Sequence, residues 1–311
     1  MSKVQIIMAS YCGEAYLRQQ LDSILILQEK NWSLLICDDG STDNTISILK
    51  EYNEKMPNQI QIHQNETNLG VTKNFLSGLM TCVKEEKSDY YMFCDQDDVW
   101  FAGRISIMLK RIKKMEKIYG KDCPLLVFSD AIVTDEKLNI KRPSYHKTQR
   151  LNVKKTDLEH LLMENKCSGC MMLFNHALAS KVTILPDNAR FHDWWIALIA
   201  AAFGHIGYIK EPTLFYRQHK KNLVGSTTRL DYIKNGITQI QKQKKALSLT
   251  QIQAAEFLKI YQKELSKEMR IKMKTFSLLS QRSPLERRIL IFKFHFLKST
   301  ILQNIGVLLL I

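Results

Sequence analysis

Residues 90–100 read YYMFCDQDDVW, an apolar run that ends in three carboxylates. In an extended chain, residues two apart face the same side, so Asp95 and Asp97 would lie roughly 6–7 Å apart on one face. Two carboxylates at that separation repel each other by about 2–3 kcal/mol at an effective dielectric constant near ~20. A divalent cation removes this repulsion, and oxygen ligands suit Mg²⁺ or Mn²⁺. The stretch therefore predicts a strand end that holds a divalent ion.

Apolar runs alternate with helix-like segments on the N-terminal side of this stretch. Such an alternation predicts an α/β fold with a doubly wound, mainly parallel sheet. Ligands of these sheets bind beyond the carboxyl ends of the strands, where CDDGS (37–41) and CDQDD (94–98) both lie. The predicted elements are strands 4–9, 33–37, 60–64 and 90–94, and helices 14–25, 46–55 and 71–86.

The second half of the chain changes character. A strand with a hairpin is predicted over 124–140, a strand over 167–175, a buried helix over 192–203, and short strands with turns over 204–219. From about Gly225 the sequence becomes rich in Lys, Gln and Leu with helical spacing. The composition predicts a domain over 1–225 and a basic helical extension over 226–311.

The overall charge is strongly basic, with 45 Lys and Arg residues against 31 Asp and Glu residues and a formal net charge of +14. This excess suits anionic partners but does not choose among nucleic acid, membrane and phosphorylated substrates. Seven cysteines, several of them in apolar runs, indicate free thiols in a reducing compartment. No signal peptide and no apolar stretch of about 20 residues is present, so a cytoplasmic location is predicted.

Two other ligand-binding motifs are excluded. DDGSTDN has Gly at its third position and no glutamate at the twelfth, so it is not an EF-hand loop. Neither GxGxxG nor GxxxxGK[ST] occurs, so the phosphate cradle of a dinucleotide-binding or P-loop protein is missing. The alternative for CDQDD is a solvated turn whose aspartates cap the following helix.

Four segments, taken in their order and spacing, resemble the nucleotide-binding half of family-two glycosyltransferases of the GT-A fold. They are VQIIMASYCGEAYLRQQLDSIL, ICDDGSTDNT, NLGVTKNFLSGL and FCDQDDVW. The resemblance implies a donor-binding half over 1–100 and an acceptor half over 101–225. It also implies inverting, metal-dependent transfer of a sugar from a nucleoside diphosphate sugar to a saccharide acceptor in bacterial surface polysaccharide (O-antigen or capsule) synthesis. FCDQDDVW, HDWW and YRQHKKN resemble more narrowly the bacterial rhamnosyltransferases, which suggests rhamnose as the sugar.

The resemblance also implies which residues bind the donor. Tyr11 and Asp39 would contact the base and ribose, with Glu14 in the same loop, and Lys73 would meet a phosphate where the family often has arginine. Each has a structural alternative: an Asx turn to Ser41 for Asp39, a helix start for Glu14 and a solvated helix lysine for Lys73.

For the metal, the resemblance implies Asp95 and Asp97, with Asp97 as the direct ligand. In the YRQHKKN segment, His219 would ligate the metal or, beside Arg217, donate to the diphosphate. Asp98 is assigned mainly to capping or orienting.

The catalytic base implied by the resemblance is Asp193, which follows His192 where the family usually has glutamate. The alternative is that Asp193 is the N-cap of the helix, and both roles are compatible. Gly169 would lie near the acceptor, and Trp194 and Trp195 would offer a platform for a sugar ring, with core packing as their alternative.

The C-terminal residues also fit more than one partner. Leu290, Phe294, Leu297, Ile301, Ile305 and Leu308 follow helical spacing with basic residues nearby, which predicts an amphipathic helix. The resemblance favours a lipid-linked acceptor and peripheral contact with the cytoplasmic face of the inner membrane, and packing onto the catalytic domain or between subunits is the alternative. Two other functions stay open: a sugar nucleotidyltransferase, although SYCGEAYL lacks its glycine-rich basic loop, and a non-catalytic basic binding protein, although no nucleic-acid module is recognisable.

Overall fold

A computed structural model describes residues 2–85, 87–220, 222 and 236–310 of the chain. The chain divides into two compact units. The sheet unit comprises Met1–Tyr145, Cys167–Leu185 and Phe191–Arg217, and the helical unit comprises His146–Lys166, Pro186–Arg190 and Gln218–Ile311. The predicted boundary near residue 225 lies outside the described residues.

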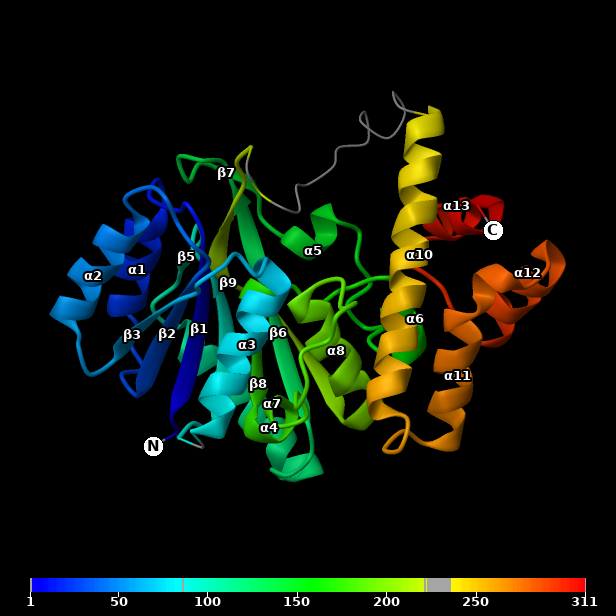
Figure 1. The fold of residues 1–311 in the computed structure, drawn as a ribbon, viewed down its shortest axis with the longest axis horizontal. Helices are drawn as coiled ribbons and strands as arrows, with labels where there is room; N and C mark the ends of the chain where they lie inside the picture. Colours follow the sequence, from blue (N-terminus) through cyan, green and yellow to red (C-terminus); the bar gives the residue numbers. More distant parts are fainter. Residues whose placement is uncertain (1, 86, 221, 223–235, 311) are drawn as a thin grey trace. The chain divides into compact units, whose positions relative to one another are not determined.

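The sheet unit contains one mixed sheet in the order β3-β2-β1-β4-β8-β6-β9-β5, with β7 paired to β6 (Figure 1). β1, β2, β3 and β4 are parallel, as the alternating pattern predicts, whereas β8 runs antiparallel to both of its neighbours. The strands are β1 Val4–Ser10, β2 Trp32–Asp38, β3 Ile60–Gln64, β4 Tyr90–Asp95, β5 Val99–Trp100, β6 Leu125–Thr134, β7 Ile140–Arg142, β8 Met172–Asn175 and β9 His205–Arg217.

Helices cover both faces of this sheet, so the predicted doubly wound α/β fold is confirmed. The helices α1 (Leu17–Leu25), α2 (Thr45–Lys55) and α4 (Arg104–Tyr119) share a core with alternate side chains of the parallel strands. The helices α3 (Val71–Lys84) and α8 (His192–Phe203) pack together on the other face. Gly78 allows α3 to lie close to the sheet, because a Cβ at this position would lie 2.7 Å from the sulfur of Cys37 in β2.

The register brings the carboxyl ends of three strands to one edge. Ser10 pairs with Asp38 and Ala9 pairs with Asp95, so the two predicted acidic segments end level with each other. β9 is a single long strand rather than the predicted short strands with turns, because irregularities in its pairing with β6 bend it without breaking it. β5 pairs antiparallel with β9 and so fixes the chain that leaves the acidic segment.

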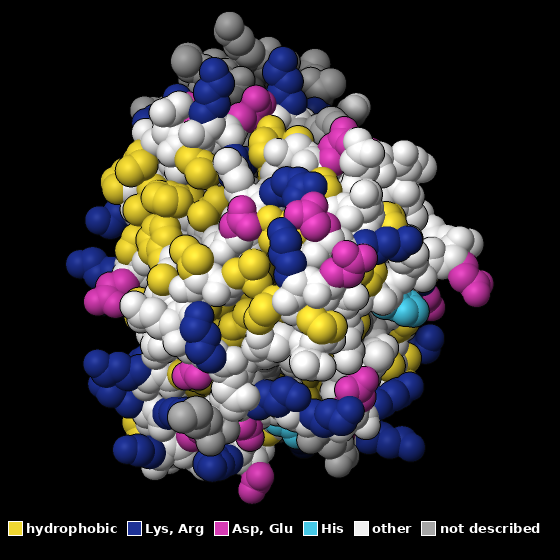
Figure 2. Space-filling view, turned by 90° about the vertical axis from the view of Figure 1, so that its left-hand side faces the viewer, with side chains coloured by type: hydrophobic (Ala, Val, Ile, Leu, Met, Phe, Trp, Pro, Cys, Tyr) yellow, Lys and Arg dark blue, Asp and Glu magenta, His cyan; other side chains and the backbone are white. Residues whose placement is uncertain are grey.

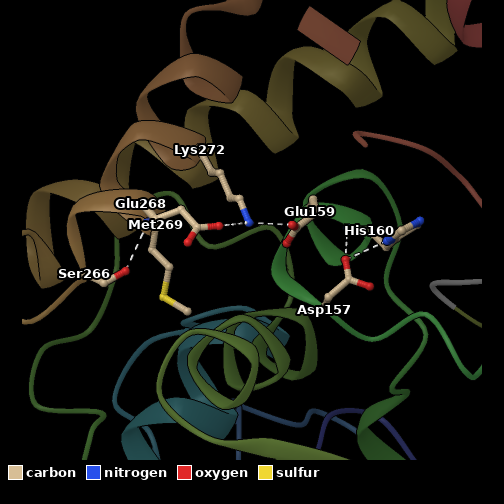
Figure 3. A network of polar contacts seen from close by, with 7 residues as sticks. All are labelled: Asp157, Glu159, His160, Ser266, Glu268, Met269 and Lys272. Atoms are coloured by element: carbon tan, nitrogen blue, oxygen red, sulfur yellow. Dashed lines mark hydrogen bonds and ion pairs between the residues drawn. The ribbon is translucent and has the colours of Figure 1, made fainter. Parts of the chain in front are cut away.

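The helical unit contains α6 Leu158–Met163, α10 Gly236–Tyr261, α11 Lys267–Ser277, α12 Pro284–Lys293 and α13 Ile301–Leu310. Lys272 of α11 lies between two carboxylates, 2.6 Å from Glu159 of α6 and 2.7 Å from Glu268 of its own helix (Figure 3). This pairing ties α6 to α11. The short helices α5 (Tyr145–Thr148), α7 (His176–Ala179), η1 (Gly169–Met171) and η2 (Leu279–Gln281) complete the described elements.

The predicted C-terminal amphipathic helix is not continuous. α12 ends at Lys293, His295 has a φ of 55°, and α13 begins at Ile301. Within the residues that the structure describes, no helix is long and apolar enough to cross a membrane.

Candidate active site

The loop after β1 is held by the middle residue of the acidic segment. The Gln96 side chain accepts from the Tyr11 N–H at 2.9 Å and donates to the Tyr11 carbonyl at 3.0 Å. Gly13 leaves room for this amide, because a Cβ at that position would lie 2.2 Å from Gln96 Oε1. The Tyr11 side chain is 51% exposed. The loop is therefore fixed through its backbone while its aromatic ring remains accessible to a ligand.

The two aspartates after β2 have different partners. Asp38 accepts four hydrogen bonds, two of them from Ser41, so the Asx turn foreseen as an alternative for Asp39 belongs to Asp38. Asp39 accepts from the N–H groups of Leu69 and Gly70 at 2.8 and 2.9 Å, and from the side chain of Asn65 at 2.8 Å. Asp39 thus shapes the loop before α3, and its role toward a donor stays a prediction.

Glu14 and Lys73 both lie at helix starts. Glu14 accepts from the backbone and side-chain N–H groups of Asn44 at 3.0 and 2.9 Å, and Asn44 is the N-cap of α2. The alternative that Glu14 serves a helix start is therefore observed, although at α2 rather than at its own helix. Lys73 lies half-buried in the first turn of α3, three residues after Gly70, which has a φ of 75°.

The acidic segment is a strand end followed by a turn. β4 ends at Asp95, and the chain turns at Gln96 and Asp97, so the extended geometry assumed for Asp95 and Asp97 is wrong. Asp98 is buried instead of solvated, and its Oδ1 accepts from the Arg217 N–H at 3.2 Å. Burial, together with the neighbouring charges of Asp97 and Asp193, raises the pKa of Asp95 to about 7.

These carboxylates meet a thiol from a distant part of the chain. The ligand atoms of Asp95, Asp98 and Cys170 all lie within 4.8 Å of one another. Asp98 Oδ2 is buried, and among the described residues no N–H or O–H group donates to it. Burial and the neighbouring carboxylates also raise the pKa of Asp98 well above its usual range. Concentrated negative charge around an oxygen that receives no N–H or O–H donor from the described residues is the environment that a divalent cation relieves, so these residues fit a metal.

Arg217 is built into the protein around this segment. Its guanidinium donates to the carbonyls of Asp97 and Glu136 at 2.7 and 2.6 Å and to Gln19 Oε1 at 2.6 Å. It also lies over the Tyr16 ring, 4.7 Å from its centroid. These contacts support a role in holding the turn of the acidic segment, whereas its predicted contact with the diphosphate stays a prediction.

Asp193 faces the same site from the start of α8. Its Oδ2 accepts from the Gly169 N–H at 3.0 Å, and its Oδ1 accepts from the Trp194 N–H at 2.6 Å. The N-cap of α8 is Phe191, which makes no side-chain cap, so Asp193 serves the helix start from inside its first turn. Because its charge raises the pKa of Asp95, the predicted base lies near the acidic segment.

Gly169 is required by packing against α8. A Cβ there would lie 2.5 Å from His192 Nε2 and 3.3 Å from the Asp193 Cβ. The absent side chain therefore allows the Gly169 backbone to approach Asp193, and a role in admitting the acceptor stays a prediction. His192 stacks on Phe75 with ring centroids 4.0 Å apart, and burial lowers its pKa to about 3, so it is neutral.

Trp194 and Trp195 belong to the core. Trp195 is completely buried and Trp194 is 5% exposed, because α8 is apolar on almost every side. Core packing, the alternative that the sequence left open, is what the structure contains, so neither ring offers an exposed face to a sugar. Two other aromatic residues lie close to the site. Tyr145 and Tyr216 contact each other edge to face, with ring centroids 5.1 Å apart, and burial raises the pKa of both hydroxyl groups.

His219 belongs to the helical unit, where its backbone N–H donates to Asn222 at 2.5 Å. Its assignment as a metal ligand stays a prediction. Sequence reasoning did not place Cys170 beside the acidic segment, since the spacing of Cys167 and Cys170 lacks the second cysteine pair of a zinc site. It also missed the contacts of Gln96 with the Tyr11 backbone. Arg104 is fully buried and donates to the Cys170 carbonyl behind the site.

Comparison with known proteins gives a consistent result. The family model described as Glycosyl transferase family 2 matches residues 5–179, more than half of the chain. The dTDP-rhamnosyl transferase RfbG of Shigella flexneri is 31% identical over 228 residues, which cover 70% of this chain and 74% of that protein. The UDP-Glc:alpha-D-GlcNAc-diphosphoundecaprenol beta-1,3-glucosyltransferase WfgD of Escherichia coli is 31% identical over 111 residues, 36% of this chain and 41% of that one.

Solved structures share the fold. A mannosyltransferase from Pyrobaculum calidifontis, solved in complex with GDP-Man and Mn²⁺, superimposes with a TM-score of 0.53 at 14% identity. The match covers 99% of this chain and 80% of that one.

Proposed function

Because the chain belongs to glycosyl transferase family 2, and is thus a glycosyltransferase that uses a nucleotide sugar, we propose that its transfer is inverting and metal-dependent. The observation that carries this proposal is the position of Asp193. Its carboxylate is held by the Gly169 N–H and lies close enough to the acidic segment to act on the pKa of Asp95. A base and a metal-binding cluster thus share one site at the carboxyl edge of the sheet.

In the proposed reaction, the acceptor hydroxyl attacks the anomeric carbon of the donor and its proton passes to Asp193. The bond between the anomeric carbon and the diphosphate oxygen breaks, and its electron pair stays on the nucleoside diphosphate. Attack from the opposite side inverts the anomeric configuration.

Donor binding is assigned to the loops after β1, β2 and β3. Tyr11 has an exposed ring that can stack on the base, and Asp39 can accept from the base or ribose in addition to its loop contacts. Lys73 would meet a phosphate. Asp97 and Asp95 would hold the divalent cation, with His219 as a further ligand, and such a cation neutralises charge on the departing diphosphate when bound. The complex of the Pyrobaculum mannosyltransferase with Mn²⁺ supports a divalent cation here.

The donor and acceptor are proposed from the names of the relatives. The Shigella relative is named a dTDP-rhamnosyl transferase, which favours rhamnose. The name of the Escherichia relative specifies alpha-D-GlcNAc-diphosphoundecaprenol, which favours a lipid-linked saccharide acceptor. We therefore place the reaction in surface polysaccharide synthesis at the cytoplasmic face of the inner membrane.

Family membership decides against the two alternative functions, a sugar nucleotidyltransferase and a non-catalytic binding protein. Among its described residues, the face that carries α1, α2 and β3 also lacks the continuous basic patch expected of a nucleic-acid-binding protein. Lys and Arg side chains are interspersed there with Asp and Glu side chains (Figure 2).

The test is a panel of nucleotide sugars that includes dTDP-rhamnose, assayed for release of nucleoside diphosphate with acceptor saccharides, with and without EDTA. We expect EDTA to abolish transfer and Asp193→Asn to lower kcat by roughly 10²–10⁴-fold, because the general base is removed, while the Kd of the donor is unchanged. Asp89→Asn, at the opposite end of β4, is the matched control and should keep full activity. Wild-type kcat in Asp193→Asn would remove the base assignment.

A further inference from the structure

Large apolar side chains are exposed along one side of α12. Leu285, Ile289 and Phe292 are 70%, 56% and 56% exposed. Their spacing of four and three residues places them on the same side of the helix. Ile291 of the same helix is 1% exposed, so the opposite side is packed within the protein. The exposed side chains are therefore not buried by packing within the protein.

The same arrangement recurs on α13. Its exposed apolar residues are Ile301, Leu302, Ile305 and Leu309, at 81%, 68%, 48% and 79%. Val307 is 7% exposed and provides the inward side. Arg288 of α12 donates to the Leu308 carbonyl of α13 at 3.1 Å, which links the two helices. We name the seven exposed residues of α12 and α13 the apolar face.

The apolar face differs from the side chains predicted from the sequence. Leu290, Phe294, Leu297 and Leu308 of the predicted stripe are half-buried, because the chain turns between Lys293 and Ile301 instead of continuing as one helix. Only Ile301 and Ile305 belong to both sets.

Basic residues outnumber acidic ones in the segment that carries the apolar face. Glu286 is the single acidic residue between residues 282 and 310. The basic residues of the same stretch are Arg282, Arg287, Arg288, Lys293 and Lys298. The Arg287 and Arg288 guanidinium groups donate to backbone carbonyls. Apolar side chains flanked by cations are typical of helices that lie in the interface of an anionic membrane.

Two other partners fit this surface less well. A second copy of the chain would bring the same excess of cations against itself in a two-fold contact, which is unfavourable because like charges would meet. A nucleic acid would neutralise the cations but would leave seven apolar side chains in water. An anionic bilayer satisfies both features at once.

We propose that α12 and α13 attach the protein to the surface of an anionic lipid bilayer. The apolar face enters the boundary between head groups and acyl chains, and the flanking Lys and Arg side chains meet lipid phosphates. The helices lie on the membrane, since no described helix can cross it. This inference does not rest on the proposed function, because the surface lies on helices that contain none of the proposed active-site residues.

The test is co-sedimentation of the full chain with vesicles, without donor or acceptor. Vesicles of phosphatidylcholine mixed with phosphatidylglycerol should bind the protein, and vesicles of phosphatidylcholine alone should bind it more weakly. High salt should weaken binding, because it screens the lysines and arginines. The triple variant Leu285→Gln, Ile289→Gln, Phe292→Gln should bind roughly a thousandfold more weakly, since each buried side chain of this size contributes about tenfold.

The matched control is the double variant Ile26→Gln, Ile140→Gln, which removes side chains that are 64% and 61% exposed on the sheet unit. It should bind like the wild type. Equal vesicle binding by the triple variant and the control would overturn the proposal. Absence of vesicle binding, together with a wild-type dimer that the triple variant converts to a monomer, would overturn it in favour of self-association.

Discussion

At the scale of single residues, the site depends on contacts between side chains and backbone that no motif describes. Gln96 stands between the two acids that the resemblance assigns to the metal, yet its own contacts are with the Tyr11 backbone. Gly13 is the position that makes these contacts sterically feasible. The loop assigned to the donor base and the segment assigned to the metal are thus held as one piece.

Because the Gln96 side chain occupies the space beside Gly13, the effects of substitutions at these two positions should not be additive. We expect Gly13→Ala to raise the KM for the donor severalfold, since the new Cβ displaces Gln96 and with it the Tyr11 backbone. In a Gln96→Ala background the clash is absent, so adding Gly13→Ala should have almost no further effect. A double-mutant cycle on KM and on thermal stability measures this coupling. Additive effects would show that Gly13 acts independently of Gln96.

At the scale of elements, the helical unit is joined by a partly buried ion pair. Glu159 and Lys272 have side chains only 17% and 18% exposed, whereas the second partner of Lys272, Glu268, is 75% exposed. An ion pair contributes more when water is excluded, and the loss of one partner leaves the other charge without compensation.

We therefore expect Lys272→Met to lower the free energy of unfolding by about 1–3 kcal/mol, because Glu159 loses its hydrogen-bonded cation. Glu268→Gln removes the exposed partner of the same lysine and should change the free energy of unfolding by less than about 0.5 kcal/mol. Urea denaturation of the two variants gives the comparison. A cost for Glu268→Gln as large as that for Lys272→Met would contradict the burial argument.

The elements also show which features the sequence could predict. Strand and helix positions in the first hundred residues follow from apolar periodicity, and the parallel register then places Asp38 and Asp95 at one edge. The burial of Trp194 and Trp195 was not predictable in the same way, because a helix that is apolar on almost every side does not reveal which side faces a ligand. Cys170 joins the acidic segment through tertiary packing, which no local pattern encodes.

At the scale of the whole molecule, the acidic cluster makes stability depend on pH. The folded protein keeps the Asp95 proton up to a pH of about 7, whereas the unfolded chain loses it near the ordinary Asp pKa of about 4. Between these values the folded state binds more protons, so the stabilising contribution is present below pH ~4 and is lost as the pH rises to about 7. Asp98, with its raised pKa, acts in the same direction.

We therefore expect the free energy of unfolding of the metal-free protein to contain a component that falls between pH ~4 and ~7. The Asp95→Asn substitution should reduce this pH-dependent component. Asp89→Asn, at the far end of the same strand, should retain it. Thermal unfolding in EDTA across this pH range measures the effect. Parallel pH profiles for wild type and Asp95→Asn would show that Asp95 titrates as an ordinary carboxyl group.

The central claim is that the carboxylates after β4 bind a divalent cation together with the donor diphosphate. The most direct measurement is calorimetric titration of Mn²⁺ into the protein with saturating nucleotide sugar at pH ~8, where Asp95 is ionised. The account predicts Mn²⁺ binding by the wild type that weakens at least about tenfold in Asp97→Asn and is unchanged in Asp89→Asn. Failure of the wild type to bind Mn²⁺ or Mg²⁺ in the presence of a donor that it turns over would contradict it.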